Sequence, residues 1–227
     1  MNSSTSADNI CLLLRKNLLF DGMSDDETRR SLECLRAVRA DYLKNEYLAR
    51  QGDAMTAFGL VISGRVTISM NDIEGNRMIM ANVTSGGTFG EALNYGNEEH
   101  IPIDITAEEN VSLLWLDARR FRDDDCISDA LGRTLARNFI ALVSRRSLSM
   151  NDRIQILSKR TIRGKLITYF TQQAEHCGTA EFDIPLDRAA LADYLGSDRA
   201  ALSRELSNMR RDGLIDYTKN HFTIFTH

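Results

Sequence analysis

The residues best suited to recognise another molecule lie close together near the end of the chain. Their spacing places them on one face of a helix. They are Arg199, Ala200, Ser203 and Arg204. An arginine fork can donate two hydrogen bonds to O6 and N7 of guanine, a serine hydroxyl can contact a base or a phosphate, and an alanine methyl can touch the thymine methyl. We therefore predict a helix that reads DNA bases, with Arg204 on guanine and Arg199 on a base or a phosphate.

The segments before this helix predict a helix-turn-helix. A first helix opens at Asp187, and Gly196 supplies the tight turn into the second helix. Ser197 or Asp198 can cap the second helix through a side-chain oxygen. The apolar face of the second helix is expected to be buried, and it consists of Leu202, Leu206 and Met209.

A terminal hairpin is expected to follow as a wing, with apolar runs at 213–217 and 221–225 and a turn at Lys219-Asn220. Polar and basic side chains around the two helices and the wing are candidates for phosphate contacts, which position a protein on DNA. They are Arg188, Ser197, Arg210, Arg211 and Lys219. For the basic residues the alternative is a solvated surface charge. Further arginines in the 127–159 region can pair with the acidic first half instead of with DNA.

Composition indicates a two-domain protein of the cytoplasm. The chain has 227 residues, 43% of them hydrophobic, enough for two packed cores. It has no apolar run of the roughly 20 residues that a membrane-spanning helix needs, and its polar start lacks a signal-peptide pattern. The net charge is −8 over residues 1–126 and +4 over residues 127–227. An acidic sensor joined to a mildly basic DNA-binding part fits this distribution.

The four cysteines lie far apart in the sequence, at Cys11, Cys34, Cys126 and Cys177. No C-x-x-C or other metal-ligand spacing occurs among them. In a cytoplasmic protein we expect four reduced, structural thiols.

The first half of the chain predicts a β-barrel preceded by short helices. Ser24 and Glu27 form a capping-box pattern, which predicts a helix from about Asp25 to Leu35. Glycines then recur between short apolar runs at 58–62, 66–70, 78–83, 101–105 and 111–116. Strands at this spacing are typical of a sandwich or a jelly-roll barrel.

A single long helix is predicted after the barrel, over roughly 127–159. Its main apolar stripe includes Leu131, Leu135, Phe139, Leu142, Met150 and Ile154. A stripe of this length can pack against a second copy in a coiled-coil-like dimer seam. The alternative is packing on its own barrel, and a second stripe of Ile140, Val143 and Leu148 was the expected barrel-facing side.

Barrel, long helix and winged helix-turn-helix, in this order, resemble the Crp/Fnr family of bacterial transcription regulators. The motifs that carry the resemblance are Phe89-Gly90-Glu91 and the segment 195–206, and it spans about Leu18 to Phe225. It implies an α+β protein with a cyclic-nucleotide-binding-like β-roll at 1–126, a dimerisation helix at 127–159 and a winged helix-turn-helix at 160–227. It also implies a homodimer on palindromic double-stranded DNA, contact with RNA polymerase, and an effector pocket between β-roll and long helix.

The effector region departs from the family pattern. Members that bind cyclic nucleotides carry Arg-Ser about ten residues after Gly90-Glu91, where this chain has Ile101 and Pro102. An aliphatic side chain cannot neutralise a phosphate, and proline offers no backbone N–H. We therefore expect no cyclic nucleotide, and an effector that is still unknown. Glu91 is then expected to accept hydrogen bonds within its own loop.

Other cofactors of the family are also disfavoured by the sequence. Cys11, Cys34 and Cys126 are too sparse for an iron–sulfur cluster. His100 is the one histidine near the pocket segment, and a surface position is the simpler explanation for it than haem ligation. On the long helix, the family pattern places effector contacts at Met150 and Asn151, although an asparagine there can equally fix the register of a dimer seam.

Two other functions are alternatives to a DNA-binding regulator. A cupin-like barrel that binds a small molecule or acts as an enzyme needs several histidines for its metal, and residues 1–126 contain only His100. A sensory adaptor that uses its helix-turn-helix for protein contacts is the other. In the regulator, a signal at the barrel–helix junction is expected to alter the dimer seam, and a hinge near Lys159–Thr161 then re-aims the DNA-reading helices.

Overall fold

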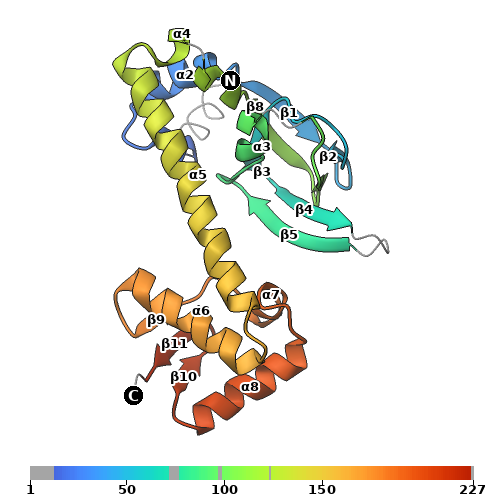
Figure 1. Cartoon of the computed structure of the whole chain (residues 1–227), viewed down its shortest axis with the longest axis vertical. Coiled ribbons are helices and arrows are strands. Elements are labelled where there is room, and N and C mark those ends of the chain that lie inside the picture. Colours follow the sequence, from blue (N-terminus) through green and yellow to red (C-terminus); the bar gives the residue numbers. More distant parts are fainter. Residues whose placement is uncertain (1–12, 72–76, 97–98, 123, 226–227) are drawn as a thin grey trace, which may run out of the picture. The chain divides into compact units, whose positions relative to one another are not determined.

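The computed structural model describes residues 13–71, 77–96, 99–122 and 124–225. The chain divides into two compact units, Met1–Ser144 and Arg145–His227, and each is described here by itself. The dividing point lies within one continuous helix, α5 (Ala130–Leu157) (Figure 1).

The first unit is built on two four-stranded antiparallel sheets, with strand orders β1-β8-β3-β6 and β2-β7-β4-β5 (Figure 1). The strands are β1 (Val38–Tyr42), β2 (Tyr47–Ala49), β3 (Phe58–Ser63), β4 (Arg65–Asn71), β5 (Arg77–Thr84), β6 (Thr88–Phe89), β7 (Asp104–Ala107) and β8 (Val111–Leu116). Four of the five apolar runs in the sequence correspond to strands. The run 101–105 contributes only its end to β7, because Ile101 and Pro102 precede that strand.

The first sheet is buried on both faces. In β3, Phe58 and Leu60 pack toward helices, whereas Val61 packs between the two sheets. In β8, Leu114 packs toward the helices and Leu113 lies between the sheets. Successive side chains of a strand point to opposite faces, so a strand covered on both sides needs a continuous apolar run. This explains why the sequence of β3 and β8 is almost uninterrupted by polar residues.

Short helices cover the outer face of the first sheet. They are η1 (Leu18–Phe20), α2 (Asp25–Cys34), α3 (Glu91–Gly96), η2 (Ala118–Arg122) and α4 (Asp124–Ile127). The predicted capping box of α2 is confirmed: the Glu27 N–H donates to Ser24 Oγ over 3.3 Å, and the Ser24 N–H donates to Glu27 Oε2 over 2.8 Å.

The long helix α5 begins later than 127, because Asp129 caps it. The Gly132 N–H donates to Asp129 Oδ1 over 2.7 Å, which satisfies one of the unpaired donors at a helix start. The interruption between α4 and α5 falls at residues 128–129.

The structure corrects the expected facing of the α5 stripes. Leu135 and Phe139 are buried in the core of their own unit, and Leu131 and Leu142 pack against that core. Of the expected barrel-facing stripe, Val143 also packs against this core, whereas Ile140 and Leu148 are each 65% exposed. Both stripes are apolar. The spacing of their residues therefore does not show which of the two packs against η1, α2 and η2. Further along α5 the exposed apolar residues are Leu148, Met150, Ile154 and Leu157.

The second unit is a three-stranded sheet packed with three helices. Its elements are α6 (Ile162–Cys177), β9 (Glu181–Asp183), α7 (Arg188–Tyr194), α8 (Arg199–Arg211), β10 (Ile215–Thr218) and β11 (His221–Ile224), with sheet order β10-β11-β9. Phe170, Phe182 and Phe222 meet in its core, where the Phe170 and Phe222 ring centroids are 4.6 Å apart. The unit has a helix-turn-helix, α7–α8, followed by the β10–β11 wing.

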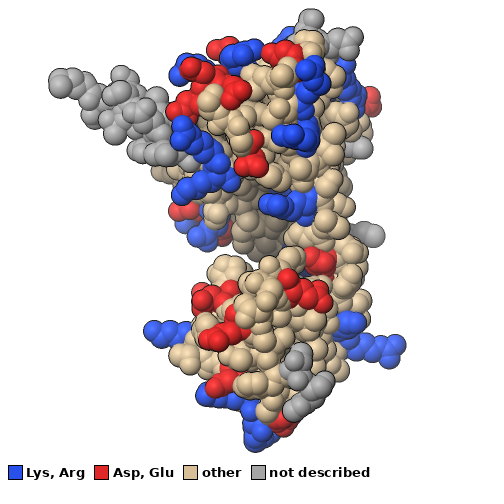
Figure 2. All heavy atoms as spheres, turned by 90° about the vertical axis from the view of Figure 1, so that its left-hand side faces the viewer, with Lys and Arg blue, Asp and Glu red and all other residues tan. Residues whose placement is uncertain are grey.

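The predicted fold class is confirmed: a β-roll, a long helix and a winged helix-turn-helix in an α+β chain. Among the residues that the structure describes, no helix is both long and apolar enough to cross a bilayer. The view in Figure 2 shows basic and acidic side chains interspersed over the visible face of the first unit, although its net charge is negative.

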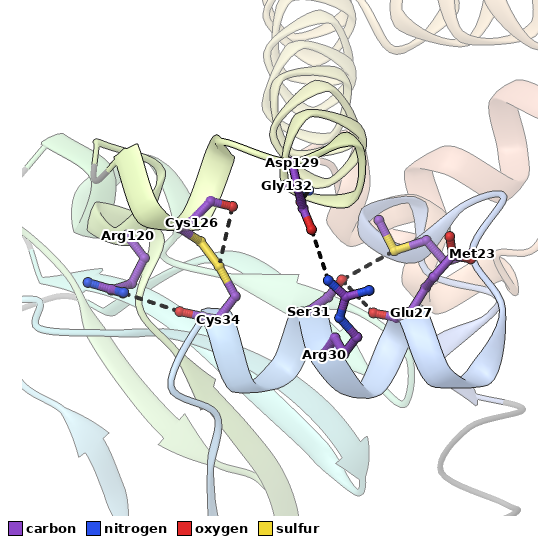
Figure 3. Close-up of a disulfide and its surroundings, with 9 residues drawn as sticks. All are labelled: Met23, Glu27, Arg30, Ser31, Cys34, Arg120, Cys126, Asp129 and Gly132. Carbon is purple, nitrogen blue, oxygen red and sulfur yellow. Dashed lines mark hydrogen bonds and ion pairs between the residues drawn. A yellow bond between two sulfur atoms is a disulfide. The ribbon is translucent and has the colours of Figure 1, made fainter.

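The cysteine prediction is wrong for one pair. Cys34 and Cys126 form a disulfide with a Cα–Cα distance of 5.8 Å, joining positions 92 residues apart (Figure 3). No sequence pattern indicates this pair, because α2 and α4 meet only through the tertiary fold. Cys177 is free and exposed, and Cys11 lies outside the described residues.

Candidate nucleic-acid interface

The helix α8 is fixed at its start by local backbone geometry. Gly196 has a φ of +56°, a left-handed conformation that glycine adopts without the strain of a side chain. Of the two predicted caps, Asp198 is the one used: the Ala201 N–H donates to its Oδ1 over 2.8 Å. The turn and cap set the direction in which α8 leaves α7.

One face of α8 is buried and the other is open. Leu202, Leu206 and Met209 are each at most 1% exposed, as predicted. The opposite face carries the four predicted base-reading residues, and all are exposed: Arg199, Ala200, Ser203 and Arg204. The structure therefore brings these four side chains together on one solvent-facing surface.

A row of serine hydroxyls runs along this face. Ser203 Oγ donates to the Arg199 carbonyl and Ser207 Oγ donates to the Ser203 carbonyl, each over 3.0 Å. A hydroxyl whose hydrogen is used in this way still has acceptor lone pairs. In this rotamer both serines can accept from a base amino group. Ser207 was absent from the predicted set, although its i+4 spacing from Ser203 was a sufficient signal.

Behind α8, Arg163 of α6 holds two acidic side chains. Its Nε lies 2.5 Å from Glu205 Oε1, and its Nη2 lies 2.8 Å from Asp212 Oδ2. The hydrogen bonds that the Arg163 guanidinium donates to Glu205, and then to Asp212, raise its pKa. Glu205 lies within α8 and Asp212 at its C-terminal cap, so one fork attaches two points of the helix to α6.

A lysine of α6 attaches the turn between the two helices. Lys165 Nζ donates to the Leu195 carbonyl over 2.7 Å and to the Gly196 carbonyl over 3.4 Å. A cation is favourable at the C-terminal end of a helix such as α7. Sequence patterns did not point to Arg163 and Lys165, since their partners lie 30 to 49 positions away.

Two of the predicted phosphate contacts instead support the wing. Arg188 Nη2 donates to the Lys219 carbonyl over 2.7 Å, and its guanidinium lies 5.0 Å from the ring centroids of Tyr217 and Phe222. Burial lowers the pKa of this guanidinium. Arg210 Nε lies 2.8 Å from Asp216 Oδ1 at the start of the wing.

The other phosphate candidates remain predictions. Arg211 is exposed and donates to Asn208 Oδ1 over 2.9 Å within α8. Lys219 is exposed at the tip of the wing, where its φ is +55°. Ser197 is half-buried, and its Oγ donates to the Ala192 carbonyl over 3.4 Å.

The expected effector region of the first unit is filled by apolar side chains. Ile101 is 1% exposed and belongs to the core between the two sheets. Gly90 has a φ of +81°, and a Cβ there would lie 2.2 Å from the Met55 terminal methyl. Glu91, the first residue of α3, is 4% exposed, whereas Pro102 is exposed.

A cyclic nucleotide does not fit these residues. Its phosphate needs a positive partner, and the sequence from Gly90 to Ile105 contains neither lysine nor arginine. The residue at the position where the family carries arginine, Ile101, is committed to the core. Met150 and Asn151 are exposed on the second unit and are described with it. His100 is exposed, with its Nδ1 2.9 Å from the Gly52 carbonyl oxygen.

The described residues hold no group of three or more His, Cys, Asp or Glu side chains arranged to bind a metal ion. His221 comes closest to a polar cluster, between Glu181 and Asp183 on the surface of the wing sheet.

Comparison with known proteins gives two domain matches. Residues 39–123 match the model of the cyclic nucleotide-binding domain, and residues 164–226 match that of the Crp-like helix-turn-helix domain. The chain is 23% identical over 214 residues to the transcriptional activator protein FnrL of Cereibacter sphaeroides, covering 89% of this chain and 82% of that protein. It is 25% identical over 197 residues to the cyclic AMP receptor protein of Thermus thermophilus, covering 87% of each.

A solved structure shares the fold. The catabolite activator protein of Thermus thermophilus superposes with a TM-score of 0.53 at 24% identity, over 92% of this chain and 94% of that one. The superposed region extends over both units of the chain.

Proposed function

Because the chain belongs to the Crp/Fnr family of transcription regulators, we propose that it acts in the cytoplasm as a homodimer that reads palindromic DNA with α8. DNA-binding transcription regulation follows from membership of this family. The observation that carries the base assignments is the exposed, rigidly supported face of α8, with Arg204 and Ser203 one residue apart. Arg204 reads guanine, and Arg199 contacts a neighbouring base or phosphate.

Ala200 determines the preference at a second base pair of the half-site. Other members of the family usually carry glutamate at this position, which accepts from cytosine N4. Ala200 is exposed and offers only a methyl group, so it favours a thymine methyl at the corresponding base pair. Compared with the half-sites of members that carry this glutamate, the preferred half-site still contains a guanine for Arg204 but no longer requires the cytosine.

The test compares two arginines of α8. Binding sites are selected from random duplex DNA with the wild type, and affinities of Arg204→Ala and Arg211→Ala are then measured over a salt series. Arg204→Ala should cost about 1–3 kcal/mol and relax the preference at one base pair, whereas Arg211→Ala should weaken all sequences alike and reduce the salt slope by about 1. If wild type and Arg204→Ala show the same sequence-blind, salt-sensitive binding, base reading by Arg204 is wrong.

The dimer seam is assigned to the exposed apolar residues of α5. Met150 and Ile154 of the predicted set remain, and the exposed Ile140 and Leu157 replace the buried Leu135 and Phe139. Met150, Ile154 and Leu157 follow one another at intervals of four and three residues, and Ile140 lies two seven-residue repeats before Ile154, as a coiled-coil seam requires.

Light scattering tests this seam. Ile154→Glu should convert the dimer to a monomer at micromolar concentration, whereas Ser149→Glu, at another exposed position of α5, should leave it a dimer. A wild type that stays monomeric with and without DNA would disprove the assignment.

The effector of the β-roll is a molecule other than a cyclic nucleotide. This rests on Ile101 and Pro102 at the positions where the family binds the cyclic phosphate. Native mass spectrometry of freshly purified protein tests for a retained small molecule, and added cyclic AMP should leave the melting temperature unchanged. A saturable rise in melting temperature with cyclic AMP would overturn this assignment.

A further inference from the structure

The disulfide lies where the helices of the first unit converge on the beginning of α5. Cys34 is the last residue of α2, and Cys126 belongs to α4, just before Asp129 caps α5. Figure 3 shows a second link beside it, from Arg30 of α2 to Asp129, with Arg30 Nη2 2.8 Å from Asp129 Oδ2. Two contacts, one covalent and one ionic, therefore attach α2 to the start of the long helix.

The disulfide adjoins a small cavity. The cavity has a volume of about 140 Å³, and its lining includes Cys34, Cys126, Arg30, Ser128 and Asp129. The side chains of Arg30 and Asp129 are 60% and 52% exposed, so this side of the cavity meets solvent. Cys34 is half-buried and Cys126 is only 6% exposed, so Cys34 is the more exposed residue of the pair.

Two arginines lie near Cys34, the more exposed of the two cysteines. Arg30 lines the cavity, and Arg120 Nε donates to the Cys34 carbonyl over 3.2 Å on the other side. Neighbouring cations favour the thiolate that attacks or leaves in thiol–disulfide exchange. They also attract an anionic thiol compound, while Asp129 offsets part of the charge of Arg30.

We propose that the Cys34–Cys126 disulfide is a redox-active site that exchanges with anionic low-molecular-weight thiols of the glutathione class. The thiolate of a first molecule attacks Cys34 Sγ and forms a mixed disulfide. The Cys34–Cys126 bond breaks, and its electron pair leaves on Cys126 Sγ, which takes a proton from water.

A second thiolate completes the reaction by attacking the small-molecule sulfur of the mixed disulfide. Cys34 leaves as a thiolate and is protonated, so two thiol molecules are oxidised to one small disulfide while the protein disulfide is reduced to two thiols. The reverse reaction, with the small disulfide as oxidant, closes the bond again.

The first turn of α5 is the element affected by this exchange. A Cβ on Gly132 would lie 2.0 Å from the Cys126 carbonyl oxygen, so α4 and α5 are in close backbone contact there. Once the disulfide is open, α2 keeps the Arg30–Asp129 pair as its described polar link to this turn. The exchange chemistry does not depend on the proposed DNA reading.

The first test uses the full chain carrying Cys11→Ser and Cys177→Ser, so that only the pair remains. The folded protein is equilibrated in mixtures of reduced and oxidised glutathione, quenched with acid, and its free thiols are counted by maleimide labelling and mass spectrometry. Both thiols should appear together as the buffer becomes more reducing, without denaturant. Thiols that appear only in urea, or that never pair in oxidised glutathione, would overturn the proposal.

A trapping experiment tests which sulfur is attacked. With oxidised glutathione, a chain that keeps only Cys34 should gain the mass of one glutathione faster than a chain that keeps only Cys126. Equal rates would contradict attack at Cys34.

The role of Arg30 is tested against a matched arginine of the same helix. Arg30→Gln should slow reduction by glutathione about fivefold, the effect of one nearby unit charge in water, and change reduction by neutral 2-mercaptoethanol much less. Arg29→Gln is the control, because Arg29 is paired with Asp26 at 2.9 Å and does not line the cavity. If both variants behave alike with both thiols, the cavity does not select an anionic thiol.

Discussion

The two units place their polar chemistry differently. In the second unit, cations stand exposed on α8, and a paired arginine and a lysine support the helix from behind. In the first unit, the position where the family binds a charged effector is buried in the sheet core as Ile101. The disulfide and the Arg30–Asp129 ion pair lie instead at the junction of α2, α4 and α5.

This difference indicates that the DNA-reading part and the sensing part follow separate constraints. A base-reading face needs exposed donors on a fixed helix, and α8 meets this need with residues close in sequence. A sensor needs only a group that responds to a signal and an element that the response can disturb. In our proposal, the redox-active disulfide before α5 is the responding group and the first turn of α5 is the element that its opening disturbs.

The largest effect is expected from removing the disulfide. Cys34→Ser should lower the free energy of unfolding by about 2–4 kcal/mol under oxidising conditions, because the bond closes a long loop in the unfolded chain. The wild type with reductant should unfold like the variant, as measured by urea denaturation. Cys177→Ser, at a free and exposed thiol, serves as the control; an equal loss there would point to a general effect of cysteine removal.

A specificity change tests the reading face. Ala200→Glu should restore a carboxylate that accepts from cytosine N4 and shift the preference at one base pair by about 1–3 kcal/mol. Competition binding with half-sites that differ at each position measures it. The preference at the guanine read by Arg204 should not move, and an unchanged profile at every position would show that residue 200 does not reach a base.

A smaller effect is expected from loosening α8 behind its reading face. Arg163→Gln removes the fork between Glu205 and Asp212 without touching an exposed α8 side chain. DNA affinity should fall by less than the about tenfold expected for loss of one base contact, with the base preference retained. A changed base preference in the selection experiment would mean that Arg163 contacts DNA itself.

The smallest effect concerns the pH dependence of the wing sheet. Hydrogen bonds to Glu181, and then to Asp183, raise the pKa of His221 above 6.5. The stabilisation is therefore fully present below the unfolded-state pKa and is lost as pH rises through the higher folded-state pKa. The melting temperature should decrease slightly more from about pH 6 to about pH 8 in the wild type than in His221→Gln. If the melting temperatures of the wild type and His221→Gln change identically with pH, His221 does not contribute to the pH dependence of stability.

Sequence reasoning succeeded where the determining contacts are local. The capping box at Ser24, the strands of the β-roll and the buried face of α8 follow from residues within a few positions of one another. It failed where one sequence pattern is compatible with two packing arrangements. Helix α5 has two apolar stripes, and only the packing of Phe139 against the β-roll helices shows which stripe is buried. It also could not find Cys34–Cys126 or Arg163–Glu205, whose partners are 92 and 42 positions apart.

The disulfide also changes how the first unit is connected. All eight strands of the β-roll lie between Cys34 and Cys126, so in the oxidised protein they form part of a covalently closed ring. One protease cut in any turn of that ring leaves its two pieces attached to each other. The same cut in the reduced protein yields two separate polypeptides, and nicked molecules would then be cleared according to the redox state in which they were cut.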